Sequence, residues 1–289
     1  MSDFSRVAII GLGLIGGSVA AALQKRKLTE HIVAYDPLKE SLDTALQSGM
    51  IDSAATSITK AVSGADLVLI AVPVLTIETI LREIPSDVLV TDVASVKQPV
   101  IDACETVYGA VPKTLVPGHP IAGSEKQGVA AANADLFEQH KVILTPNTDT
   151  DAESLRRVRS LWQNLGATVV EMSVAHHDEV LAQTSHLPHL LAYALVDTLS
   201  SQGDSMEIFQ FAAGGFRDFS RIAASDPTMW RDIIQANGPA VIAILDRFLS
   251  EMEDLRELIV AGDAEGLEVV FQRAKEARDH FSELKEPRG

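Results

Sequence analysis

The sequence contains a single cysteine, Cys104, among 289 residues. One cysteine forms no disulfide within the chain and builds no cysteine-based metal site, so we expect a reducing, cytoplasmic location. Basic residues are also few, since 24 Lys and Arg stand against 40 Asp and Glu and give a formal net charge of -16. A field of that sign repels phosphate backbones and anionic membranes, which argues against nucleic acid or a membrane as the partner.

Long apolar runs are missing as well. Gly, Pro or charged residues interrupt every run before it reaches the ~20 residues that a membrane helix needs. The first residues lack the basic start, apolar core and cleavage site of a signal peptide. With 46% hydrophobic and 22% charged residues, the composition is that of a globular protein long enough for two domains.

Short apolar runs alternate with helical patterns over the first 170 residues. This alternation predicts an α/β fold with a Rossmann-like, doubly wound parallel sheet that is covered on both faces. After about Glu171 the pattern becomes helical, and no Gly/Ser-rich linker separates the two parts. We therefore predict a dinucleotide-binding domain over residues 1–172 and a helical domain over residues 173–289. The expected strands are residues 7–10, 31–35, 67–72, 88–91, 114–116, 142–144 and 168–170.

A glycine-rich turn follows the first expected strand and opens a helix. Its sequence is Gly11-Leu12-Gly13-Leu14-Ile15-Gly16. Gly11 allows the tight turn, Gly13 leaves room for a pyrophosphate, and Gly16 lets the helix pack closely on the strand. The strand before the turn and the helix after it favour a dinucleotide site over an ordinary glycine turn.

The expected second strand ends in Asp36, whose carboxylate can accept hydrogen bonds from the adenine ribose. It would repel a 2′-phosphate, so we predict NAD rather than NADP, although Lys25, Arg26 and Lys27 lie nearby in sequence. Two further loops end expected strands at the same sheet edge, where ligands of such sheets bind. They contain Val72 and Pro73, and Asp92 and Ser95, respectively. For Asp92 and Ser95, helix capping is the alternative interpretation.

The stretch Gly118-His119-Pro120 follows the expected strand at residues 114–116. A histidine held at that edge suits general-base chemistry near neutral pH, and a structural histidine is the alternative. In the helical half, His186 and His189 share a helix face, as do Arg217 and Arg221. Arg pairs well with carboxylates, so an anionic substrate fits better than a metal, for which we predict no site. We assign Met229 and Trp230 to the core.

Five motifs resemble those of the prephenate/arogenate (cyclohexadienyl) dehydrogenases, in the family's order and over nearly the whole chain. They are Gly-Leu-Gly-Leu-Ile-Gly-Gly-Ser at 11–18, Asp-Val-Ala-Ser-Val-Lys at 92–97, Gly-His-Pro-Ile-Ala-Gly-Ser-Glu-Lys at 118–126, Ser-His-Leu-Pro-His at 185–189, and Phe-Arg-Asp-Phe-Ser-Arg-Ile-Ala with Asp-Pro-Thr-Met-Trp within 216–230. The resemblance implies NAD-dependent oxidative decarboxylation in tyrosine biosynthesis, with prephenate or arogenate as substrate and a homodimer formed by the helical domain.

The resemblance also implies roles for individual residues. His119 would accept the proton of the ring hydroxyl, Ser95 would hydrogen-bond the same hydroxyl, and Arg221 would hold a substrate carboxylate. Ser124, Glu125, His186 and His189 would line the pocket. Two alternatives stay open: another NAD(P)-dependent hydroxyacid dehydrogenase with a helical C-terminal domain, and a non-catalytic NAD-binding sensor. The sensor has no need of His119, Ser95 and Arg221.

Overall fold

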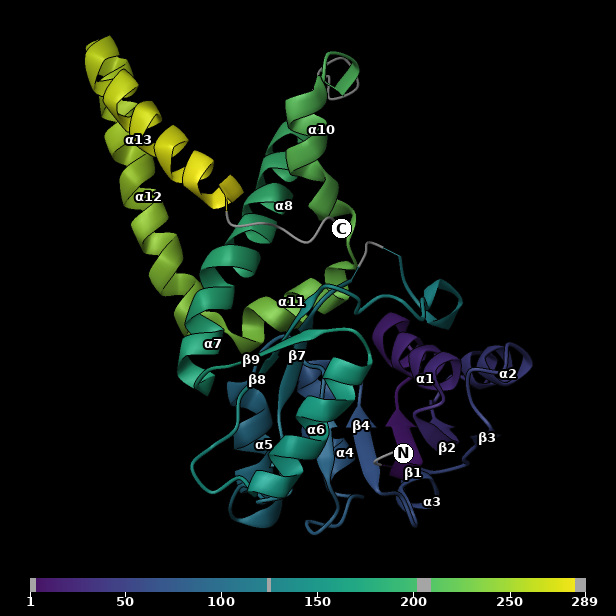
Figure 1. Cartoon of the computed structure of the whole chain (residues 1–289). Helices are drawn as coiled ribbons and strands as arrows, with labels where there is room; N and C mark the ends of the chain where they lie inside the picture. The colour runs from purple at the N-terminus through teal and green to yellow at the C-terminus, as the bar shows by residue number, and fades with distance from the viewer. Residues whose placement is uncertain (1–3, 124–125, 202–208, 284–289) are drawn as a thin grey trace. The chain divides into compact units, whose positions relative to one another are not determined.

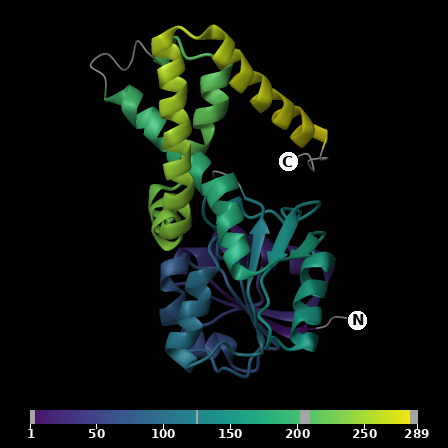
Figure 2. The same cartoon turned by 90° about the vertical axis from the view of Figure 1, so that its left-hand side faces the viewer.

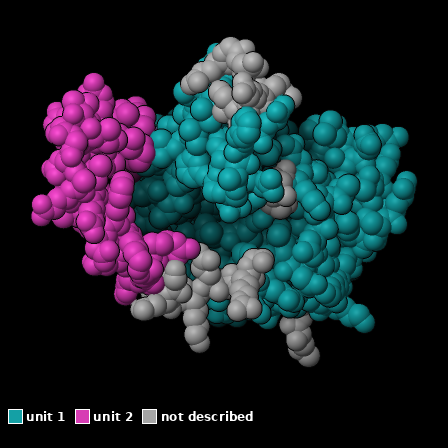
Figure 3. All heavy atoms as spheres, turned by 90° about the horizontal axis from the view of Figure 1, so that it is seen from above, with its two compact units in different colours: residues 1–238 teal, residues 239–289 magenta. Residues whose placement is uncertain are grey.

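The computed structural model describes residues 4–123, 126–201 and 209–283 (Figure 1). Its contacts divide the chain into two compact units, residues 1–238 and residues 239–289, which Figure 3 shows in different colours. The domain boundary expected between residues 172 and 173 stays a prediction. Within the described residues, no helix is long and apolar enough to cross a membrane.

A six-stranded parallel sheet forms the base of the first unit, with the strand order β3-β2-β1-β4-β5-β6. This is the order of a doubly wound dinucleotide-binding sheet, so the predicted fold class is confirmed. The register pairs Ile10 at the end of β1 with Tyr35 and Ile70, so three carboxyl ends meet at one edge. The strands are β1 (Phe4–Ile10), β2 (Thr29–Tyr35), β3 (Ser53–Ala54), β4 (Leu67–Ile70), β5 (Val90–Asp92) and β6 (Leu115–Val116).

Helices cover both faces of this sheet because its strands are apolar on both sides. Val7 and Ile9 of β1 face a core with α1 (Leu14–Arg26), α2 (Lys39–Gln47) and α6 (Ala152–Asn164). Ala8 and Ile10 face the opposite core, which contains α3 (Ile58–Val62), α4 (Ile77–Leu81) and α5 (Gln98–Tyr108). Figure 2 shows the blue helices and the teal helix α6 on opposite sides of the strands.

A second, three-stranded sheet corrects part of the sequence prediction. Its strands are β7 (Gly118–Ile121), β8 (Lys141–Leu144) and β9 (Thr168–Glu171), and β7 runs antiparallel to β8. We expected β8 and β9 in the parallel sheet and expected no strand in the stretch around His119. Apolar runs do not specify their partners, and Gly118 lets the chain pass close to β5: an added Cβ would lie 3.0 Å from the Asp92 carbonyl.

The remaining described elements are helical, as the sequence predicts. Trp230 and Ile233 of α11 (Pro227–Ala236) join the apolar core of α4 and α5, which attaches this helix to the sheet. The second unit contains α12 (Gly238–Ala261) and α13 (Ala264–Glu283). The others are η1 (Val74–Thr76), η2 (Val129–Ala131), α7 (Val174–Leu181), the π-helical turn η3 (Ala182–His186), α8 (Leu187–Ser200), α10 (Gly214–Ser220) and η4 (Arg221–Ala224).

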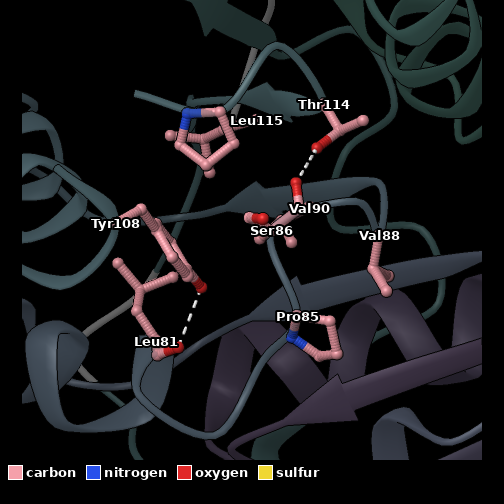
Figure 4. Close-up of a pocket in the computed structure, with 9 residues that line it drawn as sticks. Leu81, Pro85, Ser86, Val88, Val90, Tyr108, Thr114 and Leu115 are labelled. Carbon is pink, nitrogen blue, oxygen red and sulfur yellow. Dashed lines mark hydrogen bonds between the residues drawn. The ribbon is translucent and has the colours of Figure 1, made fainter. Parts of the chain in front are cut away.

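A shallow hollow lies at the amino-terminal edge of the parallel sheet (Figure 4). There the Tyr108 hydroxyl donates to the carbonyls of Leu81 and Ile84, both at 2.8 Å. Val90 and Leu115 begin their strands at this edge, whereas the predicted ligand residues lie at the carboxyl edge. The hollow is therefore separate from the candidate site.

Candidate active site

The glycine turn leaves open space at the N-terminus of α1. An added Cβ would lie 2.3 Å from the Ala71 carbonyl oxygen at Gly11, which has φ +97°, and 2.0 Å from the Gly11 carbonyl oxygen at Gly16. At Gly13, by contrast, it would meet no atom within 4 Å. Gly13 also caps α1 without a side-chain hydrogen bond, so the first N–H groups of the helix face this space. These features fit a dinucleotide pyrophosphate.

Asp36 lies directly beside this turn. Its Oδ2 accepts a hydrogen bond from the Leu12 N–H at 2.7 Å, and its Oδ1 accepts one from the Leu38 N–H at 2.8 Å. Val72 borders the same turn, since its Cγ1 would lie 3.0 Å from a Cβ on Gly11. The tertiary structure thus gathers these predicted cofactor residues at one sheet edge, where a carboxylate is available for ribose hydroxyls.

A chain of three buried side chains begins at His119 on β7. His119 Nδ1 lies 2.9 Å from His177 Nε2, and His177 Nδ1 lies 2.7 Å from Asp178 Oδ1. Asp178 also accepts hydrogen bonds from the backbone N–H groups of Lys97 and Gln98, both at 2.8 Å. The carboxylate therefore comes from the middle of α7, and the backbone at the start of α5 holds it in place behind the histidine pair.

These partners determine the proton positions on the two neutral rings. An ionised carboxylate only accepts, so His177 Nδ1 carries the proton that it donates to Asp178. His177 Nε2 is then an acceptor, and His119 Nδ1 must donate to it. The proton of His119 is therefore on Nδ1, and His119 Nε2 presents a lone pair. That is the state in which an imidazole acts as a general base.

The electrostatics keep both rings neutral. Burial, followed by the influence of His177, Lys97 and His186, holds the pKa of His119 well below its ordinary value of 6.5. Burial also lowers the pKa of His177, against the opposing effect of Asp178. For Asp178 itself burial favours the acid, but hydrogen bonds from His177, Lys97 and Gln98 outweigh burial and lower its pKa.

Lys97 is fully buried. Its Nζ forms an ion pair with Asp92 and donates to the Gly118 carbonyl at 2.5 Å, which ties the start of β7 to the end of β5. Burial lowers the pKa of Lys97, and the charge of Asp92 opposes that shift. Asp92 Oδ1 also accepts from the Ala94 N–H, whereas its buried Oδ2 has no partner among the described residues. The role of Asp92 in cofactor binding stays a prediction.

His186 and His189 lie at the junction of the π-helical turn η3 and α8. The His189 ring stacks on Trp230 with centroids 3.5 Å apart, and the His186 ring meets Trp230 edge-on at 6.1 Å. Trp230 is buried, as predicted, and so is His186, whereas Met229 is exposed on α11, so its assignment to the core was wrong. A π-turn followed by Pro188 shifts the helix register here, which is a common device at functional sites.

Comparisons with known proteins identify the family. The model of the prephenate dehydrogenase nucleotide-binding domain matches residues 19–171, and that of the prephenate dehydrogenase dimerization domain matches residues 173–273. The chain is 38% identical over 285 residues to the cyclohexadienyl dehydrogenase of Zymomonas mobilis, covering 96% of each chain. It is 40% identical to the prephenate dehydrogenase of Bacillus subtilis, covering 94% of this chain and 75% of the relative. The chain belongs to the prephenate dehydrogenase family.

A solved structure agrees with this assignment. The crystal structure of prephenate dehydrogenase from A. aeolicus in complex with hydroxyphenyl propionate and NAD+ superimposes with a TM-score of 0.87. It is 38% identical in sequence, and the match covers 99% of both chains. The resemblance drawn from the five sequence motifs is thus confirmed for this member of the prephenate dehydrogenase family.

The structure brings several of the predicted prephenate dehydrogenase residues together. His186 influences the pKa of His119, and the positive charge of Arg221 contributes, after burial, to the lowered pKa of His189. Ser95 is half-buried in the loop between β5 and α5. Ser124 and Glu125 lie outside the described residues. Within the described residues, no cluster of three or more His, Cys, Asp or Glu side chains could hold a metal ion.

Sequence reasoning missed the partners of His119. His177 and Asp178 are adjacent in sequence but lie 58 and 59 residues after His119, so no local motif connects them with that histidine. Lys97 belongs to a quoted motif, but a lysine gives no sequence signal that it is buried. A second missed residue is Asn237, whose side chain reaches both Asp178 and His186.

Proposed function

We propose that this chain catalyses the NAD-dependent oxidative decarboxylation of prephenate to 4-hydroxyphenylpyruvate, and that it also accepts arogenate, which gives tyrosine. The observation that carries the proposal is the buried chain from Asp178 through His177 to His119, which leaves a basic nitrogen at His119 Nε2. A dinucleotide-type turn at residues 11–16 and membership of the prephenate dehydrogenase family support it.

The proposed chemistry uses these groups in order. His119 Nε2 accepts the proton of the ring hydroxyl, which raises the electron density on the carbinol carbon. NAD, when bound along the open space at Gly13, supplies the acceptor for the hydride from that carbon. The resulting dienone loses its ring carboxylate as carbon dioxide, and the freed electron pair makes the ring a phenolate. His119 can then return its proton to the phenolate oxygen, which restores the base.

We propose further positions around the substrate. Ser95 hydrogen-bonds the reacting hydroxyl, and Arg221 binds a substrate carboxylate through its guanidinium. The pocket lining is assigned to Ser124, Glu125, His186 and His189. The proximity of His186 to His119 and of Arg221 to His189 supports this assignment, since His186 contributes to the lowered pKa of His119 and Arg221 contributes to that of His189.

The preference for NAD over NADP is also a proposal. Asp36 places negative charge beside the glycine turn, where a 2′-phosphate would be repelled. Lys25 and Arg26, the nearby cations, lie in the last turn of α1 and form ion pairs with Asp135 and Glu138. They are thus at the end of α1 opposite to Gly13 and are already neutralised.

We propose a homodimer formed through the helical part of the chain, and a cytoplasmic location for the enzyme. The match of residues 173–273 to the prephenate dehydrogenase dimerization domain supports the dimer. The second unit also leaves large apolar side chains exposed, which a second copy of the chain would cover. They are Ile242, Leu249, Met252, Ile259, Val260, Val269 and Phe271.

Steady-state turnover with NAD and each substrate tests the function. The purified full-length chain should reduce NAD when given prephenate and form 4-hydroxyphenylpyruvate, followed by absorbance of NADH and by chromatography. Comparison of kcat/KM for prephenate and arogenate then decides the preferred substrate. A chain that binds NAD but turns over neither compound would support the sensor interpretation instead.

A further inference from the structure

Asn237 follows α11 and is buried, yet the function proposed above gives it no role. Its side-chain Nδ2 lies 2.8 Å from the carbonyl oxygen of Asp178 and 3.0 Å from His186 Nδ1. The Asn237 amide therefore contacts two parts of the site. One is the backbone of Asp178, whose carboxylate anchors the His119 chain, and the other is the ring of His186.

The contact with Asp178 determines which way the amide points. A backbone carbonyl only accepts hydrogen bonds, so the Asn237 atom facing it must be the NH2 group. That group has two protons and no lone pair to offer. One proton goes to the Asp178 carbonyl, and the other goes to His186 Nδ1. His186 Nδ1 is therefore an acceptor, and the proton of the neutral ring must be on Nε2.

We propose that Asn237 is a positioning residue that keeps His186 neutral and protonated at Nε2, so that the ring offers the substrate an uncharged hydrogen-bond donor. This proposal rests on the proposed function, because prephenate and arogenate carry carboxylate oxygens that such a donor binds. Among the described residues, the His186 ring makes its hydrogen bond through Nδ1 alone, which leaves Nε2–H available to a ligand.

The surroundings of His186 agree with a neutral ring. Burial lowers its pKa to about 4, with His177 and His189 adding to the shift and Asp178 opposing it. The uncharged Trp230 ring also lies against it, edge-on. Protonation of Nδ1 would also place a proton against the Asn237 NH2 group. Both effects exclude the imidazolium at neutral pH.

The tautomer determines whether the ring attracts or repels an anionic substrate. Nε2–H binds a carboxylate oxygen, whereas a bare Nε2 lone pair repels it. Asn237 thus controls affinity without touching the substrate. The Asn237→Asp substitution keeps the shape of the side chain but reverses which tautomer of His186 it favours. A carboxylate only accepts hydrogen bonds, so it needs a proton on His186 Nδ1. Neutral His186 would then present the lone pair to the substrate.

The first test observes the proton itself. Full-length protein with isotope-labelled histidine is studied by nitrogen NMR, and the His186 signals are identified by their loss in His186→Gln. We expect a protonated Nε2 and an unprotonated Nδ1 in the wild type, and a protonated Nδ1 in Asn237→Asp. A proton on Nδ1 of the wild-type ring would overturn the proposal. This measurement needs no substrate, so it stands even if prephenate is not turned over.

The second test is kinetic and compares two substitutions of His186. A Gln side chain reaches the Nε2 position with an NH2 donor, whereas Asn reaches only the Nδ1 position. We expect His186→Asn to raise KM for prephenate roughly 10- to 100-fold, the size of a lost hydrogen bond to a charged group, and His186→Gln to restore most of it. Equal KM values for folded Gln and Asn variants would refute a donor role.

The Asn237→Asp variant separates positioning from a structural role. Its carboxylate raises the pKa of His186, and the imidazolium that forms at low pH donates from Nε2 again. KM for prephenate should therefore be raised at alkaline pH and recover as the pH falls. A raised KM that does not change with pH would indicate a structural role and refute the proposal. Asn164→Asp, the same change at an exposed position of α6, is the control and should behave as wild type.

Discussion

Neutralising Asp178 should disable the base without removing it. In Asp178→Asn the new amide has one oxygen and one NH2 group for three donors: His177 Nδ1, the Lys97 N–H and the Gln98 N–H. If the NH2 takes the position of Oδ1, it opposes the Lys97 N–H and also faces His177, so that the proton positions along the chain reverse. His177 then donates from Nε2, and His119 carries its proton on Nε2, where the base was. If the NH2 faces Gln98, two donors oppose each other in a buried site.

The expected losses of kcat and of stability in Asp178→Asn follow from these contacts. Loss of a correctly oriented general base costs about 10²- to 10⁴-fold in rate, and we expect kcat of Asp178→Asn to fall within that range. The KM for NAD should stay near wild type, because the glycine turn is untouched. A lost hydrogen bond to a buried charged group should also lower the free energy of unfolding by about 1.5–3 kcal/mol.

The assay is steady-state NADH formation from prephenate, together with chemical unfolding. Glu179→Gln is the matched control, since it makes the same chemical change at the next residue, where the side chain is exposed. The control should keep wild-type kcat and stability. A folded Asp178→Asn enzyme with kcat within about threefold of wild type, far from the general-base range, would refute the chain from Asp178 to His119.

Three further predictions follow from the site. Gly13→Ala should keep wild-type stability but raise KM for NAD, because the new Cβ enters the open space of the turn. Gly16→Ala should lower the free energy of unfolding by about 1–3 kcal/mol, because its Cβ meets the Gly11 carbonyl oxygen. Thermal unfolding and NAD titration check both variants. Asp36→Ala should weaken the binding of NAD and reduce the preference for NAD over NADP, measured as the ratio of the two kcat/KM values. An unchanged ratio would place the ribose contact elsewhere. Because the pKa of His119 is lowered, the base stays neutral as pH falls through 6.5, so kcat/KM for prephenate should decline only below that value. The same shift means that acid favours the unfolded chain, so stability should decrease below pH 6.5.

The sequence predicted the sheet because buried parallel strands have a clear local signature. Leu67–Ile70 is a run of four buried apolar residues, and it lies within the expected strand at residues 67–72. The prediction that β8 and β9 belong to the parallel sheet was wrong, because short apolar runs such as Val142–Leu144 and Thr168–Val170 indicate strands without indicating their partners. The third strand of that sheet is β7, which pairs with β8 and contains Gly118, His119 and Pro120, which are poor indicators of a strand. Only the close passage of Gly118 along β5 makes that strand possible.

In the candidate site, too, some features could be predicted from the sequence and others depend on the tertiary structure. By itself the sequence predicted the cofactor turn, since the strand, the glycines and the helix that fit a pyrophosphate are consecutive residues. It also singled out His119 through a local motif. Which atom of His119 is basic was decided only by the tertiary structure. That property depends on His177 and Asp178, which lie 58 and 59 residues after His119, and hydrogen bonds between side chains so distant in sequence leave no periodic pattern in a chain.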